Sequence, residues 1–292
     1  MASVKGIVAE ARSAATRQWD RARAALAAQA GDALDAAESA PARLARVIEA
    51  DMIPRLLAES PARTALPATP VPPGFADQFA AAALAEDVAA LLARLEALMA
   101  AGVPVERVYL DVMAPAARRL GAWWDDDEAD FVDVTMGLWR CQELVHALGA
   151  LMPGRAAPDG KPRSALFAPA PGEQHVLGAL IVEEFFRRNG WETCSLPALH
   201  ADELVALVAG RRFDVVGLSL SADRHVAGLA RTIAALRRVS RQPDMRVLVG
   251  GRVINLRPAL AVELGADGTA SDGAAALALA NEWMAARETV AI

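Results

Sequence analysis

A regular alternation of strand-like and helix-like segments after Pro162 constrains the fold more than any other feature of the sequence. Short β-rich runs that alternate with helical runs through short loops indicate an open parallel sheet with helices on both faces. The segments 214–218 and 246–251 are apolar without alternation, as central strands of such a sheet usually are. We predict strands at 164–169, 191–196, 214–221, 246–250 and 267–270, and helices at 176–189, 201–210, 226–239, 256–264 and 273–287.

The first half of the chain has helical character throughout. Three long helices are predicted at 76–100, 105–123 and 131–151, and an upstream helix would complete a four-helix bundle with them. Prolines cluster in 61–75 and again in 152–163, which is typical of connectors. We therefore expect a helical extension over 1–62, a helical bundle over 63–152 and an α/β domain over 163–292.

Composition and charge argue against several classes of protein. No window approaches eighteen strongly apolar residues, and the chain does not begin like a signal peptide, so we expect a cytoplasmic protein without membrane contact. Cys141 and Cys194 lie far apart inside predicted elements, which argues against a disulfide framework or a zinc site. The net charge of −6 argues against direct, sequence-independent binding to DNA, because such binding depends on cationic contacts with phosphates.

Three loops are predicted to meet at the carboxyl edge of the sheet, where open α/β folds bind their ligands. The first loop presents His175 just ahead of a helix, the second runs from Ser219 to His225, and the third contains Gly250 and Gly251. An imidazole at such an edge is placed to hold a large cofactor. A histidine at a helix start can also be purely structural, so the interpretation depends on the other two loops.

These loops resemble the cobalamin-binding domain of methionine synthase, the mutases and cobalamin-dependent regulators. That family has Asp-x-His-x-x-Gly, then Ser-x-Leu, then Gly-Gly, and this chain has Glu173-x-His175-x-x-Gly178, then Ser219-Leu220-Ser221, then Gly250-Gly251. The resemblance implies a flavodoxin-like five-stranded parallel sheet, preceded here by an all-α helical bundle. It also implies a cobalamin cofactor with His175 as the lower axial ligand to cobalt.

The resemblance assigns roles to the other loop residues as well. Glu173, in place of aspartate, keeps a carboxylate that orients the imidazole, whereas Ser221, in place of leucine, loosens the slot for the nucleotide tail. His225 lies on the same edge as His175, so it is expected to act behind the ligand or as an alternative haem ligand. The implied cofactor-binding residues of these loops are Glu173, Gln174, His175, Gly178, Ser219, Ser221, His225, Gly250 and Gly251.

In the related photoreceptors and methyltransferases, a helical bundle sits over the upper face of the corrin. It carries a Trp, nine intervening residues and then Glu-His. Here Trp123 and Trp124 match the approach, but Val134 and Thr135 stand where the Glu-His pair is expected. The resemblance thus implies that these four residues face the cofactor without supplying an upper ligand. The tryptophan pair can also simply plug the end of the bundle beside the acidic turn 125–128.

Three smaller segments, 47–57, 130–137 and 221–225, resemble the PpaA/AerR family of photosynthesis regulators, and this resemblance extends over residues 45–290. Family members are antirepressors rather than enzymes, and some bind cobalamin while others bind haem. The resemblance implies a light- or redox-responsive regulator of photosynthesis genes, whose partner is a transcriptional repressor of the CrtJ/PpsR type. Two alternatives stay open: a haem-binding sensor of the same fold, and a corrinoid methyl-carrier protein of a methyltransferase system.

Overall fold

The computed structural model describes residues 69–152, 154, 160, 162–196 and 200–290. All of them belong to the unit Ala68–Ile292. The expected extension over 1–62 and the regulator-like segment 47–57 lie outside the described residues.

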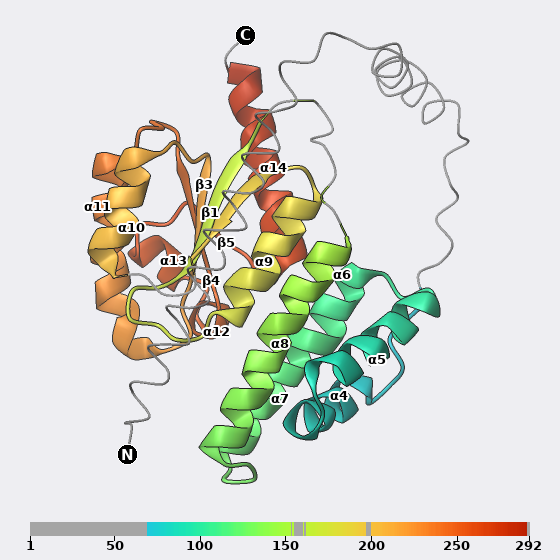
Figure 1. Ribbon diagram of the computed structural model, residues 1–292. Helices are drawn as coiled ribbons and strands as arrows, with labels where there is room; N and C mark the ends of the chain where they lie inside the picture. The colour runs from blue at the N-terminus through green and yellow to red at the C-terminus, as the bar shows by residue number, and fades with distance from the viewer. Residues whose placement is uncertain (1–68, 153, 155–159, 161, 197–199, 291–292) are drawn as a thin grey trace, which may run out of the picture. The chain divides into compact units, whose positions relative to one another are not determined.

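The C-terminal half forms the predicted five-stranded sheet (Figure 1). The strand order is β2-β1-β3-β4-β5, and every neighbouring pair is parallel. This order is the flavodoxin-like one, in which the connections reverse direction between β1 and β3. The fold class predicted from the sequence is therefore confirmed. The strands are β1 (Ser164–Pro169), β2 (Glu192–Ser195), β3 (Val215–Ser219), β4 (Arg246–Gly250) and β5 (Gly268–Thr269).

Helices cover both faces of this sheet (Figure 1). On one face, α9 (Leu177–Arg188) and α14 (Gly273–Val290) pack around Phe167 and Phe186. The other face carries α10 (Ala201–Gly210), a 3-10 turn (Asp223–His225), α11 (Val226–Val239), α12 (Arg252–Leu256) and α13 (Leu260–Glu263). The single helix predicted at 256–264 is wrong: Pro258 disfavours helical geometry at the preceding residue, so α12 and α13 are separate.

The helical half is a bundle of four helical segments among the described residues. They are α4 (Phe75–Ala85), α5 (Val88–Ala100), the continuous run of α6 (Val105–Arg107), a π-helical turn (Val108–Met113) and α7 (Ala114–Asp125), and finally α8 (Phe131–Leu151). The single helix predicted at 76–100 is wrong. The chain turns at Glu86, and the carboxylate of Asp87 caps α5 by accepting a hydrogen bond from the Ala90 amide at 2.8 Å. The bundle therefore has its four helices without an upstream one.

The π-helical turn has a local cause in the sequence. Pro115, in the first turn of α7, has no amide hydrogen and cannot continue the regular hydrogen-bond ladder. The Ala114 amide instead donates to the Tyr109 carbonyl, five residues back. The turn places the Tyr109 ring in the bundle core, where the residue is 1% exposed.

The bundle packs against the sheet domain along α9. Val176, Leu177, Leu180, Ile181 and Phe185 belong to the same apolar cluster as the bundle core. At the far end of α9, the Arg187 guanidinium donates to the carbonyls of Gly149 and Met152 at 2.9 Å, and Arg188 pairs with Glu106 at 3.0 Å. We call this contact the α9 seam. It runs down the side of α9 from the carboxyl edge.

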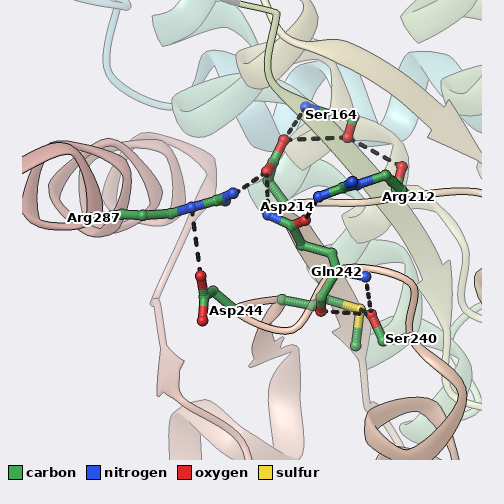
Figure 2. Close-up of polar contacts among 8 residues, drawn as sticks. Ser164, Arg212, Asp214, Ser240, Gln242, Asp244 and Arg287 are labelled. Atoms are coloured by element: carbon green, nitrogen blue, oxygen red, sulfur yellow. Dashed lines mark hydrogen bonds and ion pairs between the residues drawn. The ribbon is translucent and has the colours of Figure 1, made fainter. Parts of the chain in front are cut away.

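A polar network ties the opposite, amino edge together (Figure 2). The Asp214 carboxylate, just before β3, accepts hydrogen bonds from the Ser164 amide, the Gln242 side chain and Arg287 of α14. Arg212 in turn donates to Gln242. These contacts fix the start of β1 and the end of α14, so the amino edge serves the fold and leaves the carboxyl edge for ligands.

Candidate functional site

Strand register brings the three predicted loops together. Pro169 of β1 is opposite Ser219 of β3, and Ser219 is opposite Gly250 of β4. The pairing continues into the loops, where the Ala170 amide donates to the Ser219 carbonyl at 2.8 Å and the Leu220 amide to the Gly250 carbonyl at 2.9 Å. The loops after β1, β3 and β4 therefore leave the sheet at one level, next to the point where the connections reverse.

Glu173 is the centre of this arrangement. Its residue is 3% exposed, and one carboxylate oxygen accepts hydrogen bonds from the amides of Ser221 and Ala222, both at 2.9 Å. The other oxygen is 2.5 Å from Nδ1 of His175 and 3.0 Å from the Gln174 amide. Burial alone would raise the pKa of this carboxyl group, but the hydrogen bonds from His175 and Ser221 outweigh it and hold the pKa below its usual value.

This carboxylate determines how His175 presents itself. An ionised carboxylate only accepts hydrogen bonds, so Nδ1 of His175 carries the hydrogen and Nε2 keeps its lone pair. The His175 side chain is 57% exposed, so Nε2 is free to meet a ligand from outside. A carboxylate behind an imidazole is the arrangement that fixes the tautomer and raises the basicity of a metal-binding histidine.

The space around Gly178, Gly250 and Gly251 differs, so the need for glycine differs among the three positions. Gly251 has φ +95°, and a Cβ there would be 2.6 Å from the Leu220 carbonyl oxygen, so the fold itself requires glycine. A Cβ at Gly250 would be 3.4 Å from the Ala270 carbonyl oxygen. At Gly178 a Cβ would meet only Ser219 Oγ, at an ordinary 3.7 Å. Packing within the protein therefore does not demand glycine at 178.

The remaining loop residues fall into two groups. Ser219 presents a hydroxyl that has no hydrogen-bond partner among the described residues, and Gln174 is exposed beside His175. Ser221 takes part through its amide, which holds Glu173. His225 lies over Gly172, where a Cβ would be 3.1 Å from its ring, and its Nε2 accepts a hydrogen bond from Arg224 at 3.0 Å. The structure thus gives His225 contacts with the loop backbone of Gly172 and with Arg224.

The residues predicted to face the upper side of the cofactor differ in exposure. Trp124 is 49% exposed and its ring centroid lies 6.2 Å from that of Phe131, while Trp123 packs partly against the bundle core. Thr135 is exposed, but Val134 is 5% exposed within the bundle core. The prediction that Val134 faces a cofactor is therefore corrected: residues adjacent in a helix point about 100° apart, and Val134 takes the core side.

Sequence reasoning missed a set of exposed apolar side chains on the first half of α8. A heptad-like spacing of apolar residues outside the core positions is the signal that was available. Together with Trp124 these residues form an exposed apolar surface at the end of the bundle, of the kind that marks a binding site. The residues on α8 are Phe131 (66% exposed), Val132 (64%), Met136 (39%) and Trp139 (46%).

Among the described residues, no helix is both long and apolar enough to cross a membrane. In the same part of the chain, no three His, Cys, Asp or Glu side chains group as a metal cage. Cys141 and Cys194 are not joined in a disulfide, and burial raises the pKa of Cys141 to about 12.

Known proteins resemble this chain in sequence and in fold. Residues 163–278 match the family described as the B12 binding domain. A 20.5 kDa protein of Rhodobacter capsulatus, described as uncharacterized and located in the bchF-crtJ intergenic region, is 35% identical over 173 residues, which are 59% of this chain and 90% of that protein. These findings agree with the predicted cobalamin cofactor.

Among solved structures, the monomethylamine corrinoid protein of Methanosarcina barkeri aligns with a TM-score of 0.58 and 19% identity, over 71% of this chain and 97% of that one. A cobalamin-binding protein of Desulfitobacterium hafniense aligns over the same shares with 20% identity and a TM-score of 0.40. The first of these likenesses shows the fold. The sequence comparison goes further: the chain carries a B12 binding domain and belongs, with the Rhodobacter capsulatus protein, to the PpaA/AerR-like family.

Proposed function

We propose that the protein is a cobalamin-binding regulator without catalytic turnover of its own, which acts in the cytoplasm on a transcriptional repressor of the CrtJ/PpsR type. The observation that carries this proposal is the Glu173 carboxylate, which holds His175 and the Ser221 loop in one hydrogen-bonded unit. A histidine held in this way before any ligand arrives is prepared to bind a metal.

In this proposal, His175 binds cobalt through Nε2, and Glu173 keeps the imidazole in the required tautomer. Gly178 leaves room for the corrin edge, and the free hydroxyl of Ser219, with Gly250 beside it, receives the nucleotide tail. Trp124 and Phe131 lie at the exposed end of the bundle and would help to cover a bound ring. When bound, cobalamin supplies a metal with an exchangeable upper position and absorbance in the visible range.

In this proposal, cofactor binding at His175 affects the packing of the bundle through α9. Its first residues follow His175 directly, and Val176 and Leu177 already pack in the bundle core. A shift of His175 toward a metal therefore moves the start of the helix that makes up the α9 seam. Such a ligand changes the packing only as far as it binds one arrangement more tightly than the other.

The proposed partner and pathway rest on the family. A relative located between bchF and crtJ supports a role in photosynthesis gene expression, with light or redox state as the input. In this proposal the repressor carries sequence-specific DNA recognition, and this protein alters its hold on the promoter.

One other function has an observation in its favour. The fold likeness to a monomethylamine corrinoid protein favours a methyl carrier. A carrier has to deliver its cofactor to a partner enzyme, so the two functions differ in what the loaded protein does.

Purified protein is therefore mixed with hydroxocobalamin or with haemin, and its visible spectrum is compared with that of His175→Ala. We expect stoichiometric cobalamin binding that depends on His175, whereas a haem spectrum would favour the haem sensor. Apo and loaded protein are then titrated against the repressor. A coupling of about 1–3 kcal/mol changes the affinity roughly 5- to 150-fold. Equal affinities would contradict the regulator, and rapid methyl transfer from the loaded protein to a thiol or amine would support the carrier.

A further inference from the structure

The charge of this protein is unevenly distributed along the chain. Residues 69–152, which form the bundle, contain five arginines and thirteen acidic residues, for a net charge of −8. Residues 211–257 of the sheet domain contain ten arginines and three aspartates, with no lysine or glutamate, for a net charge of +7. Each region has an exposed surface whose charges are not neutralised by any residue that the structure describes.

The first of these surfaces lies on the outer side of α8. Val132, Met136 and Trp139 follow the spacing i, i+4 and i+7, which places them on one face of the helix. All three are exposed, because α8 buries its opposite side through residues such as Cys141 and Leu144. We call Val132, Met136 and Trp139 the α8 patch.

Acidic residues border the start of the α8 patch. Six exposed carboxylates lie between the last residue of α7 and the first turn of α8, and none forms an ion pair with a residue that the structure describes. An apolar surface with such a border is typical of a protein-binding site, where buried apolar anchors supply affinity and the charges select the partner. The α8 patch therefore favours a basic partner surface with room for a large apolar side chain. The six carboxylates are those of Asp125, Asp126, Asp127, Glu128, Asp130 and Asp133.

The second surface lies on α11 and is basic. Arg231 and Arg238 are seven residues apart, nearly two helical turns, so they point to the same side of the helix, and Arg241 follows just after its end. All three are exposed and form no hydrogen bond or ion pair with any residue that the structure describes. Arg237, by contrast, pairs with Asp267. We call Arg231, Arg238 and Arg241 the α11 arginine stripe.

A shallow cleft of about 320 Å³ lies between α10 and α11, with Arg231 of the stripe in its lining. Asp202 of α10 also lines this cleft, and much of the remaining lining is apolar. In such a cleft an indole packs its ring on the apolar walls, stacks against the guanidinium and donates its N–H to the carboxylate. The cleft therefore fits a tryptophan side chain. Its apolar lining residues include Pro171, Ala201, Val205 and Ala235.

The two surfaces complement each other but cannot meet within one chain. The bundle packs along α9, on one face of the sheet, whereas α11 covers the other face (Figure 1). We propose that the protein forms a dimer in which the α8 patch of one copy docks on the α11 arginine stripe of the other, with Trp139 in the cleft beside Arg231. Because each copy carries both surfaces, a two-fold axis uses the contact twice and closes the pair.

Two other arrangements of a dimer are less favourable. A contact between two α8 patches brings two acidic borders together, and a contact between two stripes brings arginines together, so like charges repel each other in both. Neither arrangement places the Trp139 indole in a cleft. Only the contact between patch and stripe pairs opposite charges and gives the apolar side chains an apolar surface to cover.

The test measures self-association of the purified full-length protein by sedimentation velocity, over a series of protein and salt concentrations. The stripe variant, Arg231→Glu/Arg238→Glu, and the patch variant, Glu128→Arg/Asp133→Arg, each set like charges against one another at both contacts. A 1:1 mixture of the two variants restores opposite charges at both contacts. The reversed patch of one copy then meets the reversed stripe of the other, and the two unchanged surfaces meet as in the wild type.

Two further variants separate the apolar anchor from the charges. Trp139→Ala removes the anchor without changing the net charge. Arg94→Glu/Arg118→Glu, at exposed positions of α5 and α7, changes the net charge as the stripe variant does and is its control. Thermal unfolding of every variant checks that it is folded.

We expect the wild type to form a species of twice the 30.7 kDa chain mass, which dissociates as salt is added. Each charge reversal should weaken self-association roughly 100-fold and Trp139→Ala roughly 10- to 100-fold, whereas the control should associate as the wild type does. The 1:1 mixture should also associate as the wild type does, which variants that had lost their fold could not do. A monomeric wild type, a monomeric mixture or an equal loss in the control would overturn the proposal. Assembly into chains longer than a pair would overturn the closed dimer.

Discussion

The carboxyl-edge loops and the α9 seam differ in how completely their buried polar groups are paired. In the loops, the buried carboxylate of Glu173 has a hydrogen-bond donor for each of its oxygens. In the seam, the Tyr109 hydroxyl is buried without any partner among the described residues. Glu183 of α9 has a pKa that burial raises above its usual value.

This difference means that the loops are held in one geometry, whereas the seam can change its geometry. A fully satisfied network resists movement, because any shift leaves a buried group unpaired. An unpaired hydroxyl breaks no hydrogen bond when it moves, and it can form one with a new partner or with water. The loops are therefore suited to hold a cofactor, and the seam is suited to repack in response.

The largest expected effect tests whether the loops bind as proposed. His175→Ala removes the only imidazole that Glu173 orients, so we expect cobalamin affinity to fall more than 100-fold and the bound spectrum to disappear. Absorbance titration with hydroxocobalamin measures this. His146→Ala, which changes an exposed histidine of α8, is the control and should bind normally. Unchanged binding by His175→Ala would mean that another residue holds the metal.

A smaller effect is expected from the carboxylate behind the ligand. Glu173→Gln keeps the shape of the side chain but replaces one accepting oxygen by an NH2 group. This group faces either Nδ1 of His175 or the Ser221 and Ala222 amides, so the Nδ1–H tautomer is held less firmly. Loss of such a partner typically costs 10- to 100-fold in metal affinity. The same titration measures it, with Glu203→Gln on α10 as the control. An effect as large as that of His175→Ala would indicate that Glu173 mainly keeps the loops folded.

The loops and the seam also differ in how far the sequence predicted them. Strand alternation and the His-x-x-Gly spacing predicted the sheet and the convergence of His175, Ser219 and Gly250, because these features are set by short segments and by strand register. The role of Gly251 was predicted less well, since its clash is with Leu220, a residue of another loop.

The bundle was predicted less accurately because its features depend on packing between distant segments. Apolar periodicity predicted a single helix at 76–100. The sequence also contains Asp87, whose carboxylate caps the start of a second helix within that range. The resemblance to cobalamin-binding proteins placed Val134 beside the cofactor, but only the packing of α8 decides which of two neighbouring residues faces the core. The unpaired Tyr109 hydroxyl lies in a π-helical turn, which the periodicity of apolar residues in the sequence does not predict.

The seam can be tested by removing its unpaired hydroxyl. Burial raises the pKa of Tyr109 far above its usual value, so the group stays neutral and only its missing hydrogen bond costs free energy. Tyr109→Phe keeps the ring contact with Phe185 and should raise the free energy of unfolding by about 1–2 kcal/mol. Urea denaturation followed by tryptophan fluorescence measures the change.

The same variant sharpens the comparison in a second way. If the unpaired hydroxyl helps the seam to repack, Tyr109→Phe should also reduce the effect of cobalamin on repressor affinity. Phe185→Leu, which removes the facing ring, should destabilise the protein instead. A loss of stability in Tyr109→Phe would show that the hydroxyl has a partner, such as a water bound to Glu184, and that the seam is as well satisfied as the loops.

The smallest expected effect concerns the pH dependence of the seam. Burial raises the pKa of Glu183, and hydrogen bonds from Ser195 and Thr193 only partly oppose this. An acid with a raised pKa in the folded state prefers its neutral form there, so its contribution to stability is lost as the pH rises from the unfolded pKa through the folded one. Glu183→Gln should therefore stabilise the protein at pH 8 and have little effect at pH 4, where the carboxyl group is already neutral. Thermal unfolding at the two pH values measures this, with the exposed Glu282→Gln as the control. Destabilisation at pH 8 would mean that the hydrogen bonds from Ser195 and Thr193 hold Glu183 as an anion, so that its carboxylate is as well satisfied as that of Glu173.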